Sequence, residues 1–117
     1  MSLPKLVFLL LMSLLQTGFI FTNDTEKITL NIDQGDSHLT WNKTSILRLE
    51  MENIDPQKMT ISALGIERVN QPEIRNTLML KVTPNQKNIK EAMLPLHVSY
   101  RNEKGKFVSH KFILPIN

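Results

Sequence analysis

The chain contains no cysteine, which excludes disulfides, thiolate metal sites and thiol chemistry. Glycine is also scarce, with four in 117 residues, and no glycine-rich loop of the kind that binds phosphate is present. Tryptophan occurs once, at Trp41. Any stable domain in this chain must therefore be held together without cystine cross-links.

The sequence also lacks a basic run. The net charge is +3, but lysine and arginine are scattered and usually have an acidic residue or asparagine nearby. Proteins that bind nucleic acid normally concentrate their basic residues on one patch. The composition therefore predicts no nucleic-acid partner, and the length of 117 residues fits one domain.

The N-terminus has the pattern of an export segment. Lys5 supplies one positive charge, the stretch Leu6 to Leu15 is apolar apart from one serine, and Gln16 to Gly18 are small or polar. This order is typical of a secretory signal peptide, which we place at residues 1–22. The alternative is an uncleaved membrane anchor, because Phe19 to Phe21 prolong the apolar run, although it stays short of the ~20 residues needed to span.

Both alternatives place residues 23–117 outside the cytoplasm, because Lys5 holds the N-terminus inside. The predicted location is periplasmic, at the cell surface or secreted. An exported domain without disulfides fits a bacterial periplasm or surface better than an animal secretory route. Membrane contact is expected only through the N-terminal segment, if that segment is not cleaved.

The clearest structural pattern lies at the end of the chain, between residues 93 and 116. Apolar residues alternate with others on both sides of a short polar break that contains Gly105. A period of two predicts paired strands with one buried and one wet face. A loop at 103–105, with Gly105 in the left-handed conformation, sets Leu96 opposite Phe112.

The same period recurs along the rest of the domain. The count is six to eight short strands with no long helical pattern, which predicts an all-β, immunoglobulin-like antiparallel β-sandwich over residues 23–117. The expected strands are 27–32, 46–52, 59–64, 78–82, 94–101 and 107–116, with an edge piece at 38–41 and a loop or edge strand at 66–74.

Three histidines raise the question of a metal site. The predicted hairpin register places His97 on the outer face of its sheet and His110 on the inner face, so the two cannot share an ion. No serine-nucleophile motif occurs, and Glu50 and Glu52 are expected to form a solvated row with Arg48. We therefore predict a protein that is not an enzyme, with no catalytic, metal or cofactor site.

A resemblance adds to this interpretation. The Asp55-Pro56 turn, Gly65, the Val82-Thr83-Pro84 strand end, the Gly105 turn and the closing Phe112-Ile113-Leu114 strand follow one another in a characteristic order. Over roughly residues 45–116, this order resembles the small immunoglobulin-like modules of Bacteroidetes periplasmic proteins, such as the gliding-motility and type IX secretion shaft protein GldM. The resemblance implies a structural or binding module and not a catalytic one.

The leading hypothesis is an exported, non-catalytic module that binds a protein partner in the cell envelope. One alternative is a membrane-tethered structural subunit of an envelope assembly. A weaker alternative is a small-ligand-binding or enzymatic domain around Asp36, His38 and Trp41. The candidate partner contacts are Trp41, Met79, Arg101, Phe107 and Ile113.

Overall fold

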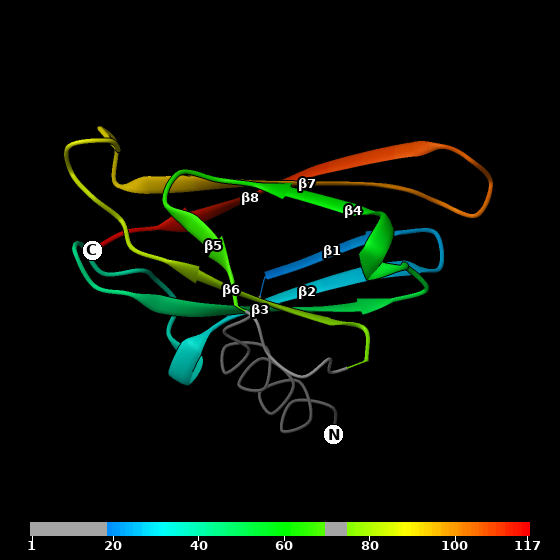
Figure 1. Ribbon diagram of the computed structural model, residues 1–117, viewed down its shortest axis with the longest axis horizontal. Helices are drawn as coiled ribbons and strands as arrows, with labels where there is room; N and C mark the ends of the chain where they lie inside the picture. Colours follow the sequence, from blue (N-terminus) through cyan, green and yellow to red (C-terminus); the bar gives the residue numbers. More distant parts are fainter. Residues whose placement is uncertain (1–18, 70–74) are drawn as a thin grey trace, which may run out of the picture.

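The computed structural model describes residues 19–69 and 75–117, which form two antiparallel sheets packed face to face (Figure 1). This confirms the predicted all-β sandwich. No helix in these two ranges is long and apolar enough to cross a membrane. The strands are β1 (Phe19–Asn23), β2 (Glu26–Ile32), β3 (Ser45–Glu52), β4 (Met59–Ser62), β5 (Ile66–Arg68), β6 (Thr77–Val82), β7 (Met93–Arg101) and β8 (Phe107–Pro115).

The strand order is that of a constant-type immunoglobulin domain with one strand added. One sheet has the order β1-β2-β3-β6-β5 and the other β4-β7-β8. Strands β2, β3, β6 and β5 thus take the places of A, B, E and D, and β4, β7 and β8 those of C, F and G. Leu39 forms a parallel bridge with Ile116, which confirms the edge piece expected near residue 39.

The added strand, β1, includes residues 19–22, which the sequence analysis assigned to the export segment. It pairs with β2 in antiparallel register, with Phe21 opposite Ile28, so residues 19–22 belong to the sandwich. An apolar run does not distinguish the end of an export segment from an edge strand, because both read as consecutive large hydrophobic residues. The remainder of the predicted segment, residues 1–18, lies outside the described residues.

The closing hairpin has the predicted register. Leu96 lies opposite Phe112 and His97 opposite Lys111. Gly105 has a φ of +77°, and its N–H donates to the carbonyl of Asn102 over 2.9 Å, which closes the turn. The left-handed glycine is therefore what brings β8 back along β7 in this register.

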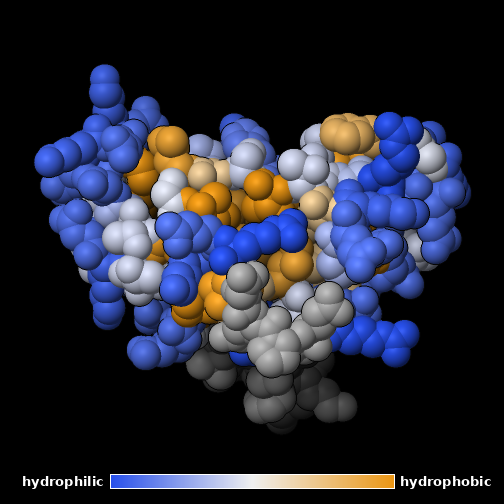
Figure 2. All heavy atoms as spheres, in the orientation of Figure 1, coloured by the Kyte–Doolittle hydropathy of each residue, from blue (hydrophilic) through white to orange (hydrophobic). Residues whose placement is uncertain are grey.

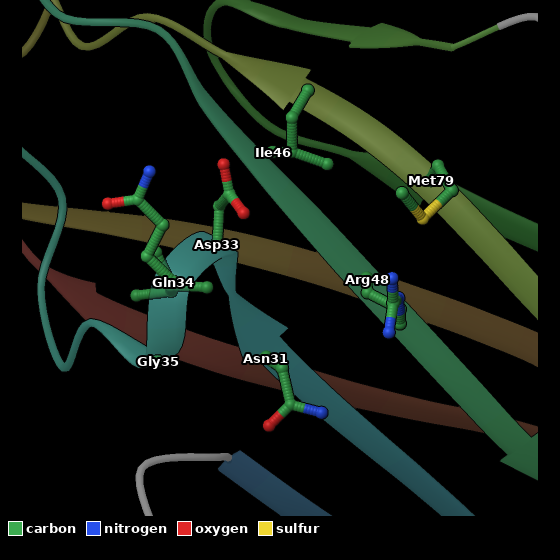
Figure 3. Close-up of a pocket in the computed structure, with 8 residues that line it drawn as sticks. Asn31, Asp33, Gln34, Gly35, Ile46, Arg48 and Met79 are labelled. Carbon is green, nitrogen blue, oxygen red and sulfur yellow. The ribbon is translucent and has the colours of Figure 1, made fainter.

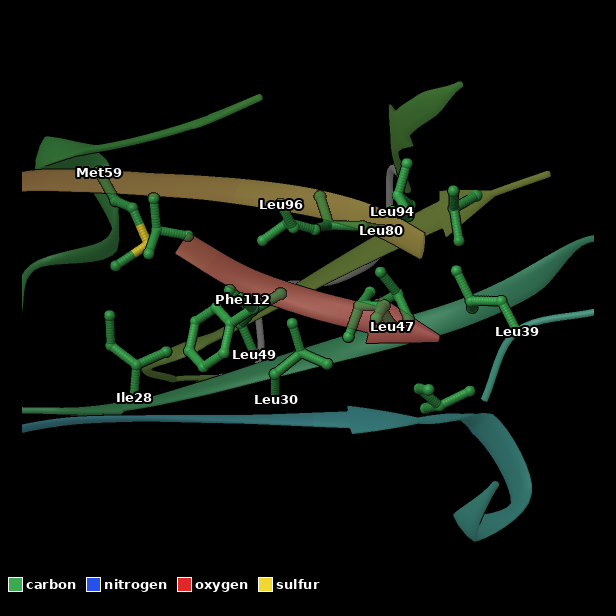
Figure 4. Close-up of a cluster of buried hydrophobic side chains, with 14 of the residues drawn as sticks. Ile28, Leu30, Leu39, Leu47, Leu49, Met59, Leu80, Leu94, Leu96 and Phe112 are labelled. Atoms are coloured by element: carbon green, nitrogen blue, oxygen red, sulfur yellow. The ribbon is translucent and has the colours of Figure 1, made fainter. Parts of the chain in front are cut away.

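The core fills the space between the two sheets (Figure 4). Leu30 and Leu49 come from the larger sheet, and Leu96 and Phe112 from the smaller. The three leucines are fully buried and Phe112 is 3% exposed. Burial of each such side chain contributes about 1.5–3 kcal/mol, so the alternating rows are sufficient to define which face of each strand turns inward.

Candidate functional site

The outward side chains of β4, β7 and β8 form one continuous surface, which we call the three-strand outer face. At its hairpin end, Phe107 lies directly opposite Arg101 and is 67% exposed. The Arg101 guanidinium donates to the carbonyl of Gly105 over 3.4 Å. An exposed aromatic ring beside a cation is a common composition for protein contact surfaces.

The opposite end of the three-strand outer face is apolar. Met93 lies opposite Pro115 and Pro95 opposite Ile113, and all four side chains are exposed. The strand β4 ends opposite His97, so β7 has no neighbour on that side at Pro95. A proline fits this position because it has no N–H to donate to a neighbouring strand. Ile113 is thus part of an apolar group rather than an isolated surface residue.

The five residues proposed as partner contacts do not form one site. Arg101, Phe107 and Ile113 share the three-strand outer face. Met79 is half-buried on the outer face of the five-stranded sheet, opposite Arg48. Trp41 is half-buried against the core at the end of the sandwich where the C-terminus lies. The structure therefore places three of the five on one face, with only Arg101 and Phe107 side by side, and puts the other two elsewhere.

A second candidate is a hollow of about 350 Å³ on the five-stranded sheet, between the end of β2 and strands β3 and β6 (Figure 3). Its charged groups are Asp33 and Arg48, and both are exposed. Exposed charges remain solvated and are poorly suited to acid–base chemistry. Among the described residues the only ion pair is Lys104 Nζ with Asp24 Oδ2, at 3.8 Å, elsewhere on the surface.

A third candidate is the side of the sandwich where β4 leads into β5. Figure 2 views this side and shows apolar side chains gathered in the middle, between polar regions at both ends. Ile61 and Ile66 are half-buried there, and Leu64, in the connection between them, is 56% exposed. Gly65 makes the connection possible with a φ of +74°.

A buried polar contact joins the two sheets near the start of β2. Tyr100, on β7, donates its hydroxyl to Glu26 Oε1 over 2.8 Å, and the Asn23 side-chain amide donates to the same oxygen over 2.9 Å. Glu26 is 8% exposed and Tyr100 2%. Burial, followed by the hydrogen bond to Glu26 and its charge, raises the pKa of Tyr100 to about 12. A phenol with this pKa stays protonated and acts as a structural donor, not as a base.

Sequence reasoning missed this contact. Glu26 lies next to turn residues and reads as part of a polar linker, while Tyr100 reads as one more inward residue of the hairpin. The two are 74 positions apart. The only local signal was an inward-facing tyrosine, because a buried phenol needs a hydrogen-bond partner.

The histidines lie as the hairpin register predicted. His97 is exposed on the outer face and His110 is half-buried on the inner face. The His110 ring stacks on Phe21 of β1, with centroids 4.3 Å apart, and meets the edge of Phe112 at 4.5 Å. Burial lowers the pKa of His110. This ring therefore links the added strand β1 to the opposite sheet.

The neighbourhood of Asp36, His38 and Trp41 contains little that points to ligand chemistry. His38 Nδ1 lies 3.0 Å from the carbonyl oxygen of Leu39, and Asp36 is exposed in the loop after β2. No group of three or more histidine, aspartate or glutamate side chains that could hold a metal ion occurs within residues 19–69 and 75–117.

Comparison with known proteins returned no relative: no family model, no curated protein and no solved structure matches this chain.

Proposed function

We propose that this chain is an exported, non-catalytic β-sandwich module that binds a protein partner in the cell envelope. The observation that carries the proposal is the three-strand outer face. It exposes Phe107, Met93 and Ile113 on a sheet whose opposite side is already packed against the core. Large apolar side chains grouped on an otherwise polar surface mark contact sites.

The start of β1 supports a cleaved export segment over a retained anchor. Because Phe19, Ile20 and Phe21 belong to the sandwich, the apolar run left for a membrane span reaches only from Leu6 to Gly18. A span needs about 20 residues. Cleavage that preserves the fold falls before Phe19, and the mature protein is then free in the periplasm, on the cell surface or in the medium.

The resemblance to the immunoglobulin-like modules of Bacteroidetes envelope proteins agrees with this proposal. Such modules serve as structural or binding units, and one module of that type is what this chain would contribute. The membrane-tethered subunit remains the second candidate. It is favoured only by the apolar residues before Phe19.

Mass spectrometry of the protein recovered from the cell that makes it separates the two candidates. A mature N-terminus at Phe19 or a few residues before it supports the cleaved form. An intact Met1 in the membrane fraction supports the tether, and a new N-terminus within residues 20–23 contradicts retention of β1 in the mature fold.

Partner binding is tested by placing a photocrosslinking amino acid at Phe107 in the intact cell. The matched control position is Ile20, which is 50% exposed on the outer face of β1. A discrete protein adduct formed at Phe107 but not at Ile20 supports a partner on the three-strand outer face. No protein adduct from positions on either sheet would contradict the proposed function.

A further inference from the structure

The two sheets differ in the balance between their acidic and basic residues. The strands of the five-stranded sheet contain four acidic and four basic residues. On its outer face, opposite charges adjoin across the strands, as in Lys27 opposite Glu52 and Glu67 opposite Lys81. That face is therefore electrically balanced by its own residues.

The three-strand outer face has no such balance. Strands β4, β7 and β8 contain no aspartate or glutamate, and their two fixed cations, Arg101 and Lys111, are both exposed and face outward. His97 lies opposite Lys111 on the same face. The nearest acidic residues in sequence, Glu91 and Glu103, lie in the turns beyond the two ends of β7.

Polar and apolar groups follow one another along this face. Arg101 and Phe107 occupy the hairpin end, hydroxyl side chains follow, His97 and Lys111 come next, and the apolar group around Ile113 occupies the far end. Strand geometry makes this arrangement about 27 Å long and about 10–15 Å wide. A surface of this size fits a small, transient protein interface.

We propose that the three-strand outer face binds an acidic protein surface that itself carries exposed apolar side chains. The proposal rests on the proposed function and specifies the partner's chemistry. Carboxylates of the partner pair with Arg101 and Lys111, and its apolar groups cover Phe107 and the group around Ile113. Complementary charge of this kind guides association and selects among partners.

Two other occupants fit the face less well. Attachment to an anionic membrane by charge usually uses a cluster of about 4–8 lysines and arginines, and this face has two. A second copy of the chain would have to offer an acidic surface, but the outer face of its five-stranded sheet carries both signs. The charge pattern thus favours a different, acidic protein.

The test uses the full-length sequence expressed and purified as the cell processes it. The probe is a glutamate–tyrosine copolymer, which is acidic and carries apolar rings, and a lysine–tyrosine copolymer is the charge-inverted control. Binding is measured by titration, and its location by NMR shift changes of the backbone amides. We expect the acidic copolymer to bind, to shift residues of β4, β7 and β8, and to weaken as salt rises from about 50 to 500 mM.

A matched pair of variants tests the face itself. Lys111→Gln with Ile113→Ser alters a cation and an apolar residue two positions apart on β8. Lys81→Gln with Met79→Ser makes the same two kinds of change on β6, in the other sheet. The β8 variant should bind the acidic copolymer about tenfold more weakly or worse, and the β6 variant within about twofold of the unchanged chain. Thermal melting confirms that both variants fold.

Several results would overturn the inference. The inference fails if the β8 and β6 variants lose the same affinity for the acidic copolymer, or if the protein binds the lysine–tyrosine copolymer instead. It also fails if the protein binds phosphatidylglycerol vesicles more tightly than the acidic copolymer, or if it self-associates through this face. If the cross-link from Phe107 forms in the cell but the acidic copolymer does not bind, the partner chemistry is wrong and the proposed function stands. If both are absent, both proposals fail.

Discussion

Gly65 and Gly105 both hold left-handed backbone, but their surroundings differ. A Cβ at Gly65 would lie 3.1 Å from the carbonyl oxygen of Thr83, whereas a Cβ at Gly105 would meet nothing within 4 Å. We expect Gly105→Ala to lower the free energy of unfolding by about 1 kcal/mol, from backbone strain alone, and Gly65→Ala to lower it further. Urea denaturation measures both losses. Ser109→Ala, on the exposed face of β8, is the control and should stay within about 0.5 kcal/mol.

The Tyr100 hydroxyl donates to a buried carboxylate, so removal of the hydroxyl should lower the free energy of unfolding. Tyr100→Phe leaves Glu26 with only the Asn23 amide, and we expect a loss of about 1.5–3 kcal/mol at neutral pH. Chemical denaturation of the two proteins at a series of pH values measures this difference.

The difference in unfolding free energy between the unchanged chain and Tyr100→Phe should depend on pH in a definite direction. The pKa of Tyr100 is about 12 in the folded chain, against an ordinary value of 10, so above pH 10 the unfolded chain holds fewer protons. The stability gained from the protonated phenol is complete below pH 10 and is lost as the pH rises toward 12. The difference between the unchanged chain and Tyr100→Phe should therefore shrink over this interval. A constant difference would mean that the phenol is not buried against Glu26.

The hairpin β7–β8 contains the cross-strand pair on which the core depends. Leu96 and Phe112 face each other across the hairpin. We expect Leu96→Ala and Phe112→Ala each to lower the free energy of unfolding by about 2–5 kcal/mol, because both side chains are buried. Because the two side chains share one contact, their losses should not add in a double-mutant cycle. His97→Ala, on the outer face, is the control and should change stability by about 0.5 kcal/mol or less. A loss at His97 equal to that at Leu96 would contradict the register.

Alternation in the sequence was enough to predict six of the eight strands, because a strand with one wet face reveals which of its residues point inward. The stretch 66–74 has no clean period, and the sequence predicts either a loop or an edge strand there, where the structure has β5. The order of the strands was not readable, since contacts such as Glu26 with Tyr100 join residues distant in sequence. The site was predictable only in part. The hairpin register placed Arg101 and Phe107 together, but the acid-free character of the three-strand outer face emerges only once β4 is placed beside β7.

Strand β1, which the sequence assigned to the export segment, is the first element of the sandwich among the described residues. A chain that starts at Phe19 retains β1, the stacking of Phe21 on His110 and the Asn23 bond to Glu26. A chain that starts at Asp24 loses all three, and β2 becomes the edge of its sheet. We expect the shorter chain to melt at a clearly lower temperature, because it exposes part of the core beside His110 and leaves the buried carboxylate with one donor.

The chains that start at Phe19 and at Asp24 should also differ in how their stability depends on pH. Burial lowers the pKa of His110, so in the longer chain the stability that comes from keeping this ring neutral is complete above about pH 6.5 and is lost as the pH falls below that value. In the shorter chain the ring loses its cover from Phe21, and this loss at acidic pH should be smaller. Melting curves of both chains between about pH 5 and 8 test the point. Equal melting temperatures at neutral pH would show that β1 contributes nothing to the fold, and the export segment could then extend to residue 22.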